Sequence, residues 1–182
     1  MHASCADTYF VFLRLQSQRG FALIELLAAI VMINVGILAI LMALNSGMVT
    51  LRRTADRSTA AAVADKQMER YRALLYSSIY LDTASLAATD ATYQGDSAYS
   101  ATPPPPAPPG TQVNQVCAPL VAACTPSQTV QGADNKSYRV DTYIVSTTPP
   151  GGQQVKQVTV VVRKAGTTPS LARVVSIFGS SF

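Results

Sequence analysis

The chain has 182 residues, of which 48% are hydrophobic and only 13% charged, and its mean hydropathy is +0.21. A soluble globular protein carries about twice that charged fraction, so the composition indicates a membrane segment or a heavily buried chain. The net charge of +4 is small and spread along the chain, so nucleic acid is not an expected partner. The single histidine is His2, which excludes a histidine-based catalytic or zinc site in the body of the chain. We therefore expect no enzymatic activity, no catalytic residues, no metal site and no cofactor.

An apolar run occupies residues 21–44 and is interrupted only by Glu25, Asn34 and Gly36. At ~1.5 Å of rise per residue it would be roughly 36 Å long as a helix, enough to cross a hydrocarbon core of about 30 Å. Residues 45–81 contain no proline and are rich in strong helix formers. We predict one long helix, with a transmembrane half over 21–44 and an amphipathic half over 45–81.

Residues 82–136 differ in character, because prolines at 103–106 and 108–109 lie within a stretch without charge from Ser97 to Ala133. This composition predicts a loop region and not a core. The last part, 137–182, holds three segments rich in β-branched residues, at 137–145, 154–164 and 171–178. They predict an antiparallel β-meander whose apolar face is covered by the amphipathic half of the helix. The expected fold class is α+β.

The start of the apolar run carries a recognisable pattern. Gln18-Arg19-Gly20-Phe21 precedes it, and Glu25 follows four residues after Phe21. The segment GFALIELLAAIVMINVGILAI resembles the N-terminus of type IV pilins, and within them it is most similar to the V-type, or pilus modification, minor pilins. The resemblance implies a leader over 1–20, cleavage by a prepilin peptidase between Gly20 and Phe21, and N-methylation of Phe21.

Glu25 has two interpretations. The resemblance implies that its carboxylate pairs with the amine of a neighbouring subunit and sets the register of assembly. The alternative is that Glu25, close to the membrane edge, only reaches the headgroups. Asn34 and Gly36 likewise either join helices in a bundle or are tolerated within the apolar segment.

The resemblance also implies that the chain crosses the inner membrane once, with the C-terminal domain outside the cytoplasm. In that compartment Cys117 and Cys124 would form a disulfide. Removal of the leader would also remove Cys5, the odd cysteine of the three.

The function expected from these observations is that of a structural minor pilin, assembled with other pilin subunits through its N-terminal helix into a type IV pilus. Two alternatives remain open. One is a pseudopilin of a type II secretion or DNA-uptake system, and the other is a membrane-anchored extracytoplasmic binding module.

Overall fold

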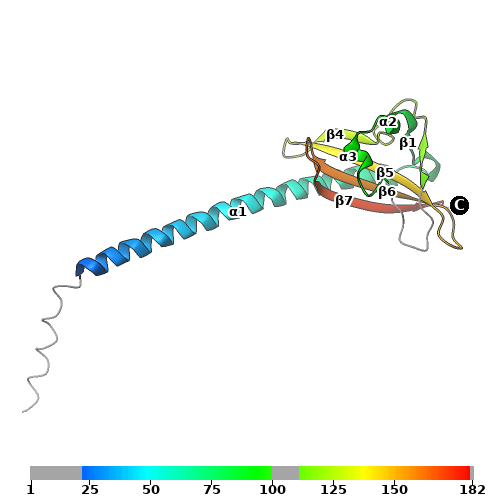
Figure 1. The fold of residues 1–182 in the computed structure, drawn as a ribbon. Helices are drawn as coiled ribbons and strands as arrows, with labels where there is room; N and C mark the ends of the chain where they lie inside the picture. Colours follow the sequence, from blue (N-terminus) through cyan, green and yellow to red (C-terminus); the bar gives the residue numbers. More distant parts are fainter. Residues whose placement is uncertain (1–21, 100–110, 181–182) are drawn as a thin grey trace, which may run out of the picture. The chain divides into compact units, whose positions relative to one another are not determined.

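The computed structural model describes residues 22–99 and 111–180 (Figure 1). The predicted leader 1–20, Phe21 and the proline-rich stretch 103–109 lie outside these residues. The expected α+β class is confirmed: a long N-terminal apolar helix packs on an antiparallel β-sheet. The elements are α1 (Ala22–Arg72), a 3-10 turn (Tyr76–Ser78), β1 (Leu81–Asp82), α2 (Thr83–Ala87), α3 (Ala91–Gln94), β2 (Thr111–Gln112), β3 (Asn114–Gln115), β4 (Ser127–Gln131), β5 (Ser137–Thr147), β6 (Val155–Lys164) and β7 (Ser170–Gly179).

The chain divides into two compact units, with the boundary after Leu51. In the described part of the first unit, 22–51, every residue from Leu23 to Leu51 is exposed, including all of its large apolar side chains. This part of α1 is long and apolar enough to cross a membrane. Since it buries nothing within its own unit, its apolar surface needs another environment, such as lipid or other helices.

In the second unit, the remaining turns of α1 bury one face. Ala60, Ala64, Met68 and Tyr71 are fully buried at helical spacing and join the hydrophobic core. Small side chains at 60 and 64 allow the helix to lie close to the sheet, while Met68 and Tyr71 fill the space beyond them. As predicted, this part of α1 packs on one face of the sheet.

The helix ends at Arg72, earlier than the predicted 81. Leu74 N bonds to Tyr71 O at 3.1 Å, which tightens the last turn. Beyond it, Ile79 and Leu81 are buried on either side of half-buried Tyr80, the period-two pattern of an extended chain. The burial of Ile79 and Leu81 therefore favours an extended chain here, despite the helix propensity of the segment.

The sheet has the order β2-β5-β6-β7, and β4 also pairs with β5. The three predicted strands correspond to β5, β6 and β7, which form the antiparallel meander with Val140 opposite Val162 and Val160 opposite Val174. Gly166, in the turn between β6 and β7, has a φ of 76°, which a residue with a side chain rarely adopts. The short strands β2 and β4 add to the far side of β5, and both come from the region predicted as loop.

The segment 82–99, also predicted as loop, covers the second face of the sheet. Asp82 and Asp90 cap α2 and α3, each side chain accepting a backbone N–H three residues on. Between them these short helices place Leu86 and Tyr93 in the core. The prediction of a coreless loop over 82–136 is therefore wrong for this segment, because local caps and two apolar anchors suffice to fold it.

Candidate functional site

The predicted assembly residues lie at the start of α1. Glu25 is in the first turn of α1 and is exposed. Asn34 donates from Nδ2 to the carbonyl of Ile30 at 2.8 Å, so part of its amide is satisfied within the helix. A Cβ added at Gly36 would meet no atom within 4 Å. Gly20 and Phe21, the predicted cleavage and methylation site, lie outside the described residues.

The predicted disulfide joins Cys117 and Cys124, whose Cα atoms are 6.6 Å apart. The loop that it closes is bound to β1 at both ends: Cys117 N donates to the Asp82 carboxylate at 3.1 Å, and Asp82 N donates to Cys124 O at 2.8 Å. It is also bound to α1, because the Tyr71 hydroxyl donates to Ala123 O. The disulfide loop is thus part of the folded domain, while its tip exposes Leu120 and Val121.

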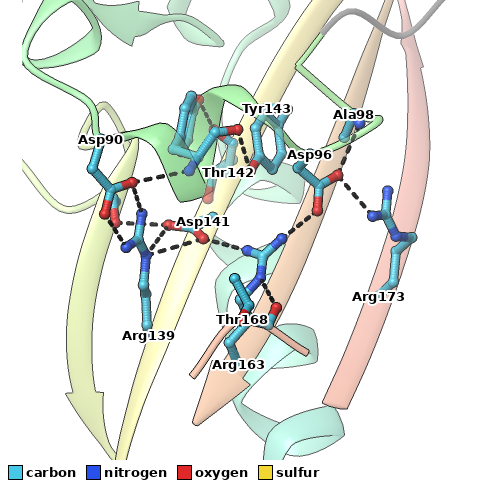
Figure 2. Close-up of polar contacts among 12 residues, drawn as sticks. Asp90, Asp96, Ala98, Arg139, Asp141, Thr142, Tyr143, Arg163, Thr168 and Arg173 are labelled. Carbon is cyan, nitrogen blue, oxygen red and sulfur yellow. Dashed lines mark hydrogen bonds and ion pairs between the residues drawn. The ribbon is translucent and has the colours of Figure 1, made fainter. Parts of the chain in front are cut away.

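A ladder of alternating charges, absent from the sequence predictions, crosses the face of the sheet under the segment 82–99 (Figure 2). Arg139 binds Asp90 at 2.7 Å and Asp141 at 2.8 Å. Arg163 joins Asp141 to Asp96, and Arg173 closes the series on Asp96 at 2.7 Å. We call these six residues the Asp–Arg ladder.

Burial makes the Asp–Arg ladder energetically important. The side chains of Asp141, Arg163 and Asp96 are 0%, 4% and 5% exposed. A buried charge is costly unless it is paired, and here each one contacts at least one group of opposite sign. Asp90 and Asp96 belong to the segment 82–99, which we call the cover, whereas the arginines belong to β5, β6 and β7. The ladder therefore holds the cover on the sheet.

The ladder also shifts the pKa values of Asp90, Arg139 and Asp96. Hydrogen bonding from Arg139 lowers the pKa of Asp90 far below its usual range, and the same contact with Asp90 raises the pKa of Arg139. For Asp96, burial acts to raise the pKa, but the Ala98 backbone N–H and the guanidinium groups of Arg173 and Arg163 outweigh it, so the pKa is lowered. Asp90 and Asp96 are therefore held ionised at neutral pH.

Buried tyrosines complete the core on the same face. Tyr93 and Tyr143 stack with ring centroids 4.3 Å apart, and Tyr99 meets the Tyr93 ring edge-on at 5.8 Å. Tyr93 OH donates to Thr142 O at 2.6 Å, and Tyr143 OH donates to Tyr93 O at 3.1 Å. Burial raises the pKa of both hydroxyls, so these groups act as neutral structural donors and not as acids or bases.

The second unit carries surface pockets that are lined by both polar and apolar groups. One is a groove of about 480 Å³ beside β4, with Ser85, Ala88, Thr89 and Pro126 among its lining residues. Within residues 22–99 and 111–180, no group of three or more His, Cys, Asp and Glu side chains is placed to hold a metal ion.

No protein-family model, curated protein or solved structure matches the chain. The geometry alone therefore defines the class: within the described residues, the protein has one helix long and apolar enough to span a membrane and an α+β domain that contains a disulfide.

Proposed function

We propose that this chain is a structural filament subunit, a minor pilin of a type IV pilus. In this proposal a prepilin peptidase cleaves after Gly20, Phe21 becomes the methylated N-terminus, and the apolar half of α1 is held in the inner membrane until it packs against other subunits. The protein acts by assembly and not by catalysis.

One observation carries this proposal. The residues of α1 from Leu23 to Leu51 bury no side chain, whereas the same helix continues into a tightly packed domain. A membrane anchor alone requires about 20 apolar residues. A helix that continues from the apolar segment into the domain without a loop fits a subunit whose helix must pack in a fixed register with others.

The disulfide supports the proposed location of the domain. Disulfides persist in oxidising compartments and are rare in the cytosol, so the Cys117–Cys124 bond favours a domain on the outer side of the inner membrane. The same topology applies to a pseudopilin of a secretion or DNA-uptake machine.

Mass spectrometry of the protein isolated from membranes tests the processing step. We expect the mature chain to begin at Phe21 with one added methyl group. An intact leader, or cleavage beyond Leu44, would contradict the proposal because the apolar helix would then be either uncut at Gly20 or removed.

Glu25→Val tests the role of the carboxylate in assembly. We expect normal membrane insertion, since the change makes the segment more apolar, and loss of the subunit from sheared filaments. Glu69→Val is the matched control, because it removes an exposed carboxylate from the other half of the same helix. If both variants enter filaments as well as the unchanged chain does, Glu25 has no assembly role.

A further inference from the structure

Strand β7 forms one edge of the sheet. It runs for ten residues, Ser170–Gly179, and pairs only with β6 among the strands described. The outer edge of such a strand presents backbone N–H and C=O groups that can receive a further strand. Its only charged residue, Arg173, already binds Asp96. The edge therefore lacks the free charges that commonly block strand addition.

The side chains of β7 also form an exposed apolar row. Val175 is 50% exposed and Ile177 is 65% exposed. Val175 and Ile177 lie on the face of the sheet that the segment 82–99 covers. Thr159 of β6, opposite Val175, is only 3% exposed, so the burial by this segment is much stronger on β6 than at Val175. On β7 the cover contacts Arg173 through Asp96, but it leaves Val175 and Ile177 exposed, and these two side chains form a ridge beside it.

The opposite edge of the sheet offers a matching groove. Strand β4 lies there, on the far side of β5, as Figure 1 shows. The 480 Å³ groove lies between β4 and the cover, and its lining includes Ser127 and Thr129 of β4 together with Ala88 and Pro126. Ser127 is opposite Asp141 and Thr129 is opposite Arg139, so the groove opens on the same face of the sheet as the ridge.

The strand directions make these edges complementary. Strand β4 is antiparallel to β5, β5 to β6, and β6 to β7, so β7 runs opposite to β4 within one chain. When two copies stand in the same orientation, edge to edge, β7 of one copy is therefore antiparallel to β4 of the next. Both contribute the same face to the joined sheet.

We propose that β7 of one copy docks on β4 of a second copy and places the Val175–Ile177 ridge in its groove. Val175 then lies opposite Thr129, with Ile177 opposite Ser127. No like charges meet, because β4 is uncharged and the groove pair Asp90–Arg139 is already joined. The contact is heterologous, so it repeats from copy to copy and generates a row or a helix.

This inference rests on the proposed function only for the common orientation of copies anchored in one membrane. Cysteine cross-linking of the full-length chain tests it. Copies with Ile177→Cys and copies with Thr129→Cys, both in a Cys5→Ser background, are co-expressed in one membrane and treated with a short bis-maleimide. We expect mixed dimers that contain one copy of each variant, and no dimers when either variant is expressed alone.

Two controls define the result. Leu75→Cys, exposed in the same domain but outside strand β7, replaces Ile177→Cys and should give no mixed dimer. Val175→Lys, added to the Ile177→Cys copy, should abolish the mixed dimer, while an unchanged melting temperature shows that the domain remains folded. Equal dimer yields from the Leu75 and Ile177 variants, or dimers from one variant alone, would overturn the proposed contact.

The outcome is separable from that of the proposed function. If the mixed dimer is absent while Phe21 is methylated and Glu25 is required for assembly, the edge contact alone is wrong. If the mixed dimer forms while the leader stays uncut, the pilin proposal alone is wrong.

Discussion

The two parts of α1 have nearly opposite surroundings, although they belong to one helix. From Leu23 to Leu51 the side chains are apolar in nearly every direction and all are exposed. From Arg52 to Arg72 the helix is rich in charge, and a narrow face of small and apolar residues is buried. The first part depends on surfaces outside its own unit, whereas the second depends on contacts within the domain. The same kind of substitution should therefore have different effects in the two parts.

The largest difference should come from charge. Asp141→Ala removes the buried carboxylate between Arg139 and Arg163 and should lower the free energy of unfolding of the domain by about 3–5 kcal/mol, because each arginine loses one of its two carboxylate partners and the Arg163 guanidinium is buried. Urea unfolding of the detergent-solubilised chain measures this. Glu69→Gln, which breaks the exposed pair with Arg72, should cost at most about 1 kcal/mol. A similar small cost for both would show that the ladder does not hold the cover.

Enlarging an alanine compares the two parts of the helix directly. Ala64 is fully buried against the sheet, so Ala64→Leu should lower domain stability by about 1–3 kcal/mol through overpacking. Ala39→Leu, in the exposed apolar part, should change it by less than about 0.5 kcal/mol. Thermal melts of both variants in the same detergent measure the contrast. If Ala39→Leu is the more damaging change to the domain, the stated division of contacts is wrong.

Glycines extend the comparison to the domain surface. A Cβ at Gly132 would lie 2.6 Å from the Tyr138 ring and 2.7 Å from Thr59, whereas one at Gly47 would meet nothing within 4 Å. Gly132→Ala should therefore lower domain stability. Gly47→Ala should stabilise the helical conformation of α1 by up to about 1 kcal/mol, because alanine has the higher helix propensity. Circular dichroism during unfolding follows both effects. A stabilising Gly132→Ala would contradict the close contact.

Lowering the pH should affect the stability of the two units differently, and this is the smallest of the expected effects. The pKa values of Asp82, Asp90 and Asp96 are lowered by hydrogen bonds and guanidinium groups in the folded domain. A lowered folded pKa contributes stability above the unfolded value, near 3.9, and this contribution is lost as the pH falls through the folded pKa. The domain should therefore melt at progressively lower temperature below about pH 4, while the far-ultraviolet helix signal of the apolar segment persists. A melting temperature that does not change between pH 6 and pH 3 would contradict this expectation.

Much of the architecture could be predicted because its signals are local. The apolar run marks the first part of α1, and alternation of β-branched residues marks β5, β6 and β7. The cover was not predicted, although Asp82 and Asp90 are capping residues at the starts of α2 and α3 and could have indicated them. Two short helices of four and five residues give too little periodicity to stand out from a loop.

The Asp–Arg ladder could not be predicted for a different reason. Arg139 and Asp141 alternate with apolar residues along β5, which is the usual pattern of a strand with one face in water. Arg139 pairs with Asp90, 49 residues away along the chain, and Asp141 pairs with Arg163, 22 residues away. Arg163 in turn pairs with Asp96, 67 residues away. Tyr143 and Val145, on the same face of β5, were the available signs that this face is also buried.

The link after Arg72 determines how mechanical load passes through the protein. Lys156 of β6 donates to the carbonyls of Tyr76 and Ile79 at 2.7 and 2.8 Å, and its ammonium lies 4.5 Å from the centre of the Tyr76 ring. A force that pulls on α1 is thus resisted by this bond cluster as well as by the covalent chain. The central strand β6 receives part of the tension directly, so the connection yields only when several bonds break together.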